Sequence, residues 1–184
     1  HGVSEALYLT DPDGHGIEIY CDRPRSQWYT NQNILLMYTH PLDIDDVLSE
    51  RTHNPQLFSG LPYGTAIGHV HLHVADLEKA NRFYIDILGF ERPPISAKIP
   101  SASFINAGGY HHTLGLNIWA GLGAPPPTSN HARLLSFEMI FSDQDQLDRV
   151  RQRLNSAGIQ QEKQHQGWLV RDPSLNPILM RMTN

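Results

Sequence analysis

The stretch GHVHLHVADLEKANRFYIDILGF, residues 68–90, holds a strand, a helix and the end of that helix in close succession. Polar and apolar residues alternate in its first part, which is the period-two pattern of a half-buried strand. Asp76 then stands where a helix N-cap belongs, and apolar residues recur at helical spacing as far as Leu88. Gly89 occupies the position at which helices commonly end in the left-handed conformation. The stretch therefore predicts a strand followed by a helix.

Three more strands are expected after this helix. They fall near residues 90–95, 102–107 and 111–118, and Gly108 with Gly109 forms the turn between the last two. The predicted order of the whole unit is β-α-β-β-β.

The same order recurs towards the C-terminus. RLLSFEMIF (133–141) predicts a strand and QDQLDRVRQRLNSAG (144–158) predicts a helix with one apolar face. Three further strands are expected near residues 159–164, 168–171 and 177–182. A second β-α-β-β-β module is therefore predicted.

The first twenty residues match the end of such a module. Two strand patterns flank the turn Asp11-Pro12-Asp13-Gly14, and Asp172-Pro173-Ser174-Leu175 repeats that turn between the last two strands of the chain. Internal repetition of this kind indicates copies of one structural unit. We therefore expect residues 1–21 to be the last two strands of an upstream module whose earlier part lies outside this sequence.

Two further segments complete the expected domain organisation. Residues 22–66 are rich in Pro, Asn, Asp and Ser and predict a connector with one short helix near residues 43–50. Residues 67–184 are expected to form a two-module domain.

Composition excludes several classes of protein. The chain has 184 residues with a formal net charge of −5, so no basic surface points to nucleic acid or to an acidic membrane. A single cysteine, Cys21, rules out a disulfide framework within the chain. No apolar run approaches the ~18 residues of a membrane span. We expect a cytoplasmic protein.

Three stretches together resemble the vicinal oxygen chelate superfamily, which includes glyoxalases, bleomycin- and fosfomycin-resistance proteins and extradiol ring-cleaving dioxygenases. They are residues 68–90, quoted above, DPDGHGIEIY (11–20) and GGYHHTLGLNIW (108–119). The His-His-Thr of the last one is similar to extradiol dioxygenases, and in particular to four-module bacterial proteins of the catechol-2,3-dioxygenase type. The resemblance implies an α+β fold in which paired β-α-β-β-β modules form cupped, barrel-like mixed sheets.

The resemblance also implies a divalent metal and the residues around it. His69 and Glu18 match metal-ligand positions, and a third ligand, a histidine, is expected in the missing N-terminal part of the upstream module. His112 matches a catalytic acid–base histidine, and Tyr8 matches a tyrosine that assists catalysis. The upstream and central modules would then share one metal, across the connector or between subunits.

Several histidines are predicted to line the cavity around this metal. His69, His71 and His73 share one face of their strand, and three histidines on a core-side face are costly unless they are solvated or bound. His71 and His73 are therefore assigned to the cavity lining, together with His111. Since His111 and His112 are adjacent in an expected strand, they should point to opposite faces, and the resemblance selects His112 for the site. A polar open face remains the alternative for the histidines, and a solvent-facing carboxylate is the alternative for Glu18.

The final module lacks these residues. Ser136 falls where a histidine ligand is expected, Leu179 where the glutamate is expected and Leu169 where the tyrosine is expected. Neither leucine can bind a metal. This module is therefore predicted to bind no metal by itself.

The sequence favours a metal-dependent extradiol dioxygenase that acts on a catechol-type substrate with O₂. Fe(II) is the expected metal, with Mn(II), Ni(II) or Zn(II) as alternatives. Two other functions stay open: a glyoxalase-type metal-dependent isomerase or lyase, and a non-catalytic small-molecule-binding protein of the resistance type with a vestigial site. The expected partners are a small aromatic or other small-molecule substrate and either further copies of the chain or the missing N-terminal segment.

Overall fold

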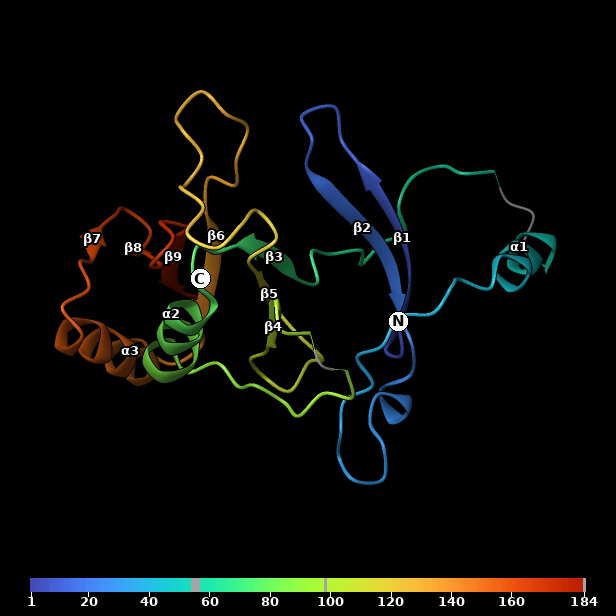
Figure 1. The fold of residues 1–184 in the computed structure, drawn as a ribbon, viewed down its shortest axis with the longest axis horizontal. Coiled ribbons are helices and arrows are strands. Elements are labelled where there is room, and N and C mark those ends of the chain that lie inside the picture. Colours follow the sequence, from blue (N-terminus) through green and yellow to red (C-terminus); the bar gives the residue numbers. More distant parts are fainter. Residues whose placement is uncertain (54–56, 98, 184) are drawn as a thin grey trace. The chain divides into compact units, whose positions relative to one another are not determined.

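The computed structural model describes residues 1–53, 57–97 and 99–183 and contains two compact units (Figure 1). The first unit consists of His1–Gly68 with Pro94–Lys98. The second consists of His69–Pro93 with Ile99–Asn184. The segments expected as hairpin and connector thus lie together in the first unit. Among the described residues, no helix is both long enough and apolar enough to cross a lipid bilayer.

The central part of the second unit forms a three-stranded sheet with one helical segment. Its elements are β3 (Val70–His73), α2 (Leu77–Asn81), η2 (Arg82–Leu88, a π-helical continuation of α2), β4 (Ala102–Ile105) and β5 (Leu114–Asn117). The strand order is β3-β5-β4, with β3 parallel and β4 antiparallel to β5. This mixed sheet follows from the helix that connects β3 to the later strands.

The C-terminal part of the second unit has the full β-α-β-β-β order. Its elements are β6 (Phe137–Phe141), α3 (Gln144–Ser156), β7 (Glu162–Lys163), β8 (Trp168–Arg171) and β9 (Pro177–Met182). The strand order is β6-β9-β8-β7, with only the β6–β9 pair parallel. The predicted α+β class with mixed sheets is confirmed, and the described strands form separate sheets rather than a closed barrel.

The expected strand near residues 90–95 is wrong. The structure has only isolated bridges there, between Glu91 and Asn106 and between Ile95 and Leu35. Pro93 and Pro94 follow at once, and a proline has no N–H group to donate to a sheet ladder. The central sheet therefore has three strands instead of four.

The helix ends follow the local signals. The Asp76 carboxylate accepts a hydrogen bond from the backbone N–H of Lys79 at 3.0 Å, which is the predicted N-cap. Gly89 ends the helical segment with φ of 92°, a conformation that favours glycine. Both predicted ends are confirmed.

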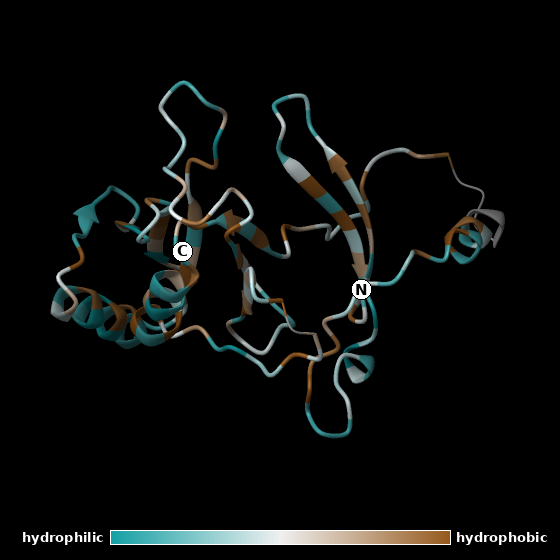
Figure 2. Ribbon diagram, in the orientation of Figure 1, coloured by the Kyte–Doolittle hydropathy of each residue, from teal (hydrophilic) through white to brown (hydrophobic). Residues whose placement is uncertain are grey.

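One hydrophobic core joins the two modules of the second unit. Phe83 and Tyr84 from η2 pack in the same cluster as residues of α3 and β9. α3 is coloured mostly hydrophilic in Figure 2, and its few apolar residues are the ones that are buried: Leu147, Val150 and Leu154. The Tyr84 hydroxyl donates a buried hydrogen bond to Asp172 Oδ2 at 3.0 Å, which links η2 to the turn between β8 and β9.

The first unit begins with the expected hairpin. β1 (Ser4–Thr10) and β2 (Gly16–Asp22) pair antiparallel. A short helix η1 (Arg25–Gln27) follows, and α1 (Ile44–His53) is the helix expected in the connector. The buried core of this unit is small and comes from residues on both sides of η1: Val3, Trp28, Leu35 and Met37.

The repeated Asp-Pro turn is confirmed at atomic detail. The Oδ1 atom of Asp11 accepts hydrogen bonds from the backbone N–H groups two and four residues later, at 2.9 and 2.8 Å. The Oδ1 atom of Asp172 accepts from the same two positions, both at 2.8 Å. Each aspartate thus forms the same Asx-type turn between two antiparallel strands, which supports the predicted internal repeat.

Candidate metal centre

Two of the candidate histidines come from the start of β3. His69 directly precedes the strand and His71 lies in it two residues later, so both side chains lie on one face of the sheet. Their ring centroids are 5.1 Å apart. His71 pairs in register with Gly115 on β5, and a Cβ atom at Gly115 would lie only 2.6 Å from His71 Cε1. The His71 ring therefore lies across β5 at the one position in that strand without a side chain.

The third histidine, His112, lies in the segment that precedes β5. It is buried, and its ring centroid is 4.3 Å from that of His69 and 5.7 Å from that of His71. Its Nδ1 atom lies 2.8 Å from His111 Nδ1, so one of these nitrogens donates a hydrogen bond to the other. Since β5 begins only at Leu114, strand alternation does not apply here. The prediction that His111 and His112 point to opposite faces is therefore wrong.

The three histidines form a potential metal-binding group. The ligand nitrogens of His69, His71 and His112 all lie within 4.8 Å of one another. Three nitrogens at about 2.1 Å from one metal would be separated by roughly 3–4 Å. Small side-chain movements would therefore bring all three into bonding distance.

His112 provides the test of whether this group suits a metal. Its Nε2 atom is buried and has no hydrogen-bond partner within the described part of the chain. Burial, followed by the positive charge that His69, His111 and His71 can carry, lowers the pKa of His112 from 6.5 to about 2. The ring is thus neutral at physiological pH, and a neutral imidazole is the form that ligates metals. The donor set fits a divalent metal.

Aromatic side chains border the cluster. Trp119 lies beside His71 with nearly parallel rings, at an interplanar angle of 28° and a centroid distance of 6.5 Å. Its indole N–H donates to Ser101 Oγ at 3.2 Å, and the ring is 60% exposed. Phe104 packs edge-on against His112. One side of the cluster is therefore apolar and partly open to solvent.

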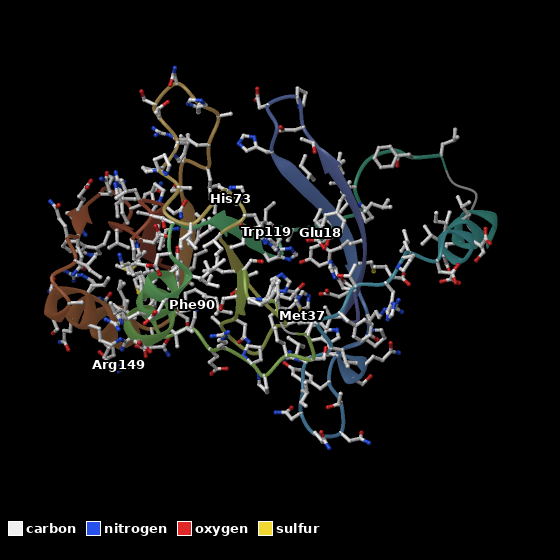
Figure 3. The ribbon with its side chains drawn as sticks, in the orientation of Figure 1. Glu18, Met37, His73, Phe90, Trp119 and Arg149 are labelled. Carbon is white, nitrogen blue, oxygen red and sulfur yellow. The ribbon has the colours of Figure 1, made fainter. Side chains whose placement is uncertain are left out.

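His73 does not join the cluster. It is the last residue of β3, its side chain is exposed, and its backbone carbonyl accepts a hydrogen bond from Asn176 Nδ2 at 3.3 Å. His73 and Trp119 are both labelled in Figure 3. Of the residues predicted to line the cavity, the structure brings His71 and His111 close to His69 and His112.

Glu18 and Tyr8 lie together on the hairpin of the first unit. They are paired in register across β1 and β2, and the Tyr8 hydroxyl donates to Glu18 Oε1 at 2.7 Å. Partial burial of this hydroxyl, together with the hydrogen bond to Glu18 and its charge, raises the pKa of Tyr8 above its usual range. Figure 3 labels Glu18.

His1 belongs to the same group, and the sequence analysis missed it. Its Nε2 atom is hydrogen-bonded to the Tyr8 hydroxyl and lies 3.6 Å from Glu18 Oε1, while its Nδ1 atom is 3.0 Å from Thr39 Oγ1. His1 precedes β1, so strand periodicity gives it no orientation. No signal in the sequence alone placed it beside Glu18.

The C-terminal module carries leucines at the equivalent positions. Leu169 and Leu179 pair across β8 and β9, as Tyr8 and Glu18 pair across β1 and β2. The number of residues that separates each leucine from Asp172 is the same as the number that separates Tyr8 or Glu18 from Asp11. Neither side chain has an atom that could bind a metal.

The sequence of this chain is similar to those of known proteins. A family model, described as the Glyoxalase/Bleomycin resistance protein/Dioxygenase superfamily, matches residues 66–173. A protein of Bacillus subtilis (strain 168) named catechol-2,3-dioxygenase is 46% identical over 174 residues, which are 94% of this chain. The chain spans 60% of the length of that curated relative.

Two solved structures show the same fold at low sequence identity. A putative glyoxalase family protein from Bacillus anthracis has a TM-score of 0.51 at 18% identity, over 68% of this chain and 100% of its own. A trypanothione-dependent glyoxalase I of Leishmania major has a TM-score of 0.51 at 15% identity, over 65% of this chain and 87% of its own. These likenesses concern the fold alone. The superfamily resemblance read from the sequence is thus confirmed, and the chain belongs to the glyoxalase/bleomycin resistance protein/dioxygenase superfamily.

Proposed function

We propose that this chain forms part of a metal-dependent extradiol dioxygenase that opens the ring of a catechol-type substrate with O₂. The observation that carries the proposal is the histidine cluster of the second unit, in which His112 keeps a neutral, buried Nε2 atom without a partner among the described residues. The similarity to a protein named catechol-2,3-dioxygenase supports this reaction class over others in the superfamily.

His69 and His71 are the imidazole ligands in this proposal, and His112, the third member of the cluster, lies beside the metal without ligating it. Glu18 is the proposed carboxylate ligand, on the strength of the resemblance and of its matching position after the Asp11 turn. Two histidines and one carboxylate are the ligand set of non-haem Fe(II) oxygenases, so Fe(II) is the proposed metal. When bound, such a metal lowers the pKa of a coordinated hydroxyl and leaves positions open for substrate and O₂.

The roles of the remaining residues follow from their protonation. His112 accepts a proton from a substrate hydroxyl at Nε2 and later returns it, since its ring is neutral and that nitrogen has no hydrogen-bond partner among the residues that the structure describes. His111 orients the ring through the Nδ1–Nδ1 contact. Tyr8 is proposed to stabilise negative charge on oxygen, because its hydroxyl stays protonated. The exposed face of Trp119 gives an aromatic ring a surface to pack on.

The test uses the full-length protein, made metal-free and reloaded without oxygen with Fe(II), Mn(II), Ni(II) or Zn(II) in separate samples. Catechol and O₂ are then supplied, and O₂ uptake and ring-opened product are measured together. The proposal expects both signals in equal amounts with Fe(II). His112→Gln should abolish turnover while metal content is kept, whereas His73→Gln, on the same strand but outside the cluster, should change neither.

Two results would assign another function. Conversion of the hemithioacetal of methylglyoxal and glutathione with Ni(II) or Zn(II), with no O₂ uptake from catechol, would indicate a glyoxalase-type isomerase. Calorimetric binding of catechol without any product, for every metal, would indicate a binding protein. Either result would overturn the dioxygenase assignment.

A further inference from the structure

A cavity lies in the C-terminal module, and none of the clustered histidines lines it. Its volume is about 680 Å³, and every residue that lines it falls between Glu138 and Thr183, within the second unit. Its walls are formed by α3, by Glu138 of β6, by the segment from Lys163 of β7 to Trp168 of β8, and by the C-terminal end of β9. Small-molecule sites in proteins commonly have volumes of roughly 300–1,000 Å³. The cavity is large enough for a small metabolite.

Two cations are held against one indole ring in this cavity. The guanidinium carbon of Arg151 lies 3.7 Å from the centroid of the Trp168 ring, and Lys163 Nζ lies 4.6 Å from the same centroid. Arg151 is held further by Gln161 Oε1, which accepts from its Nε at 3.3 Å. Cation–π contact draws both head groups onto an apolar surface and reduces their contact with water. Two of the side chains that line this cavity therefore carry positive charges close to the same ring.

The side chains that line the cavity carry more positive than negative charge. Three cationic side chains line it, Arg151, Lys163 and Arg181, against the single carboxylate of Glu138. Glu138 is already paired, because Arg181 Nε donates to it at 2.7 Å. Asp148, which is not part of the lining, contacts Arg151 at 3.4 Å. Within the described residues, no carboxylate pairs with Lys163, although the protein as a whole carries a net charge of −5.

We propose that this cavity binds a small anionic molecule through a carboxylate or phosphate group, whose oxygens are contacted by Lys163 and Arg151. Lys163 supplies a point charge, and Arg151 supplies the N–H donors that Gln161 and Asp148 do not occupy, and both groups suit an oxyanion. Since the Trp168 ring is already covered by the two cations, recognition depends on the anionic group and not on stacking of the ligand. His165 also lines the cavity and offers a further donor.

The experiment titrates the full chain with orthophosphate and, separately, with benzoate, at constant ionic strength set by chloride, and follows binding by calorimetry. Saturable binding at one site is expected for at least one of the two anions, and the one that binds identifies the preferred group. Lys163→Gln should weaken this binding by about tenfold, which corresponds to the loss of one charge-assisted hydrogen bond. Lys163→Arg keeps the charge and should bind nearly as well as the wild type.

Lys79→Gln is the matched control, because it removes the same charge from an exposed position on α2 in the same unit. It should leave binding unchanged. Lys163 is exposed on the two-residue strand β7, and circular dichroism of each variant verifies that the fold is retained. Absence of saturable binding for both anions would overturn the proposal. So would equal weakening by Lys79→Gln and Lys163→Gln, because the effect would then belong to overall charge.

Discussion

His112 is neutral because it is buried, and this has a consequence for stability. Its pKa is about 2 in the folded chain and 6.5 when the ring is free, so the unfolded chain binds one more proton between these values. The free energy of unfolding of the metal-free protein should therefore be unaffected by His112 above about pH 6.5. Below this pH it should fall by up to about 1.4 kcal/mol per pH unit. Urea unfolding at several pH values measures the slope. His112→Gln should have a shallower slope than the wild type, and equal slopes would contradict the prediction.

Gly115 tests whether His71 takes part in metal binding. A methyl group there would overlap the His71 ring, 2.6 Å from Cε1, and the exposed ring can move aside at little cost to the fold. Gly115→Ala should therefore weaken metal binding by about tenfold while it changes the free energy of unfolding by less than about 1 kcal/mol. Calorimetric titration with Mn(II) gives the affinity.

Gly16→Ala serves as the control for this substitution. Gly16 is also in a strand, and nothing lies within 4 Å of the added Cβ atom, so metal affinity should stay the same. If Gly115→Ala bound metal as tightly as the wild type, His71 would line the site without ligating.

At the candidate site, strand periodicity predicted the positions of some side chains and not of others. Strand period two placed His69 and His71 on one face, and the structure has them there. The same rule failed for His111 and His112, because the chain leaves strand geometry before Leu114. His1 was missed altogether, since its position depends on contacts with Tyr8 and Glu18 that no local pattern encodes.

At the scale of elements, local chemistry was decisive for helices and weaker for strands. The ends of the helix after β3 were predictable because Asp76 and Gly89 each satisfy a local requirement of the backbone. β7 is only two residues long where six were expected, because only Glu162 and Lys163 pair with β8.

The Asp76 cap gives a measurable energy. Asp76→Ala removes the acceptor for the N–H group of Lys79 and should lower the free energy of unfolding by about 1 kcal/mol. Asp86→Ala, an exposed aspartate in the middle of η2, removes the same charge without a cap and should change stability by less than about 0.5 kcal/mol. Thermal or urea unfolding compares the two variants. Equal losses would show that the charge, and not the cap, is responsible.

At the scale of the whole molecule, the contact between Tyr84 and Asp172 joins residues that are 88 positions apart. Burial, with the charge and hydrogen bond of Asp172, raises the pKa of Tyr84 well above 10.0. Tyr84→Phe removes a buried hydrogen bond to a carboxylate and should cost about 1.5–3 kcal/mol in urea unfolding.

Tyr84→Phe should also change how the free energy of unfolding depends on pH in alkaline solution. Because the unfolded tyrosine ionises at lower pH than the folded one, the wild type should lose stability as the pH rises above about 10. Tyr84→Phe lacks this residue and should lose less over the same range. A variant as stable as the wild type at neutral pH would show that Asp172 is satisfied by its own turn alone.

The core that spans both modules has a consequence for how the chain could be divided. β5 ends at Asn117 and β6 begins at Phe137, and the proline-rich segment between them forms no helix or strand. Several hydrogen bonds of the second unit cross from one side of this segment to the other, among them Tyr84 to Asp172, Arg153 Nε to the carbonyl of Ile87 at 2.6 Å, and the N–H of Ala75 to Ser174 Oγ at 2.8 Å. A peptide bond broken within it would leave these contacts and the shared apolar cluster intact. The two modules could therefore be produced as separate polypeptides that assemble with each other, because each buries the apolar residues that the other leaves exposed.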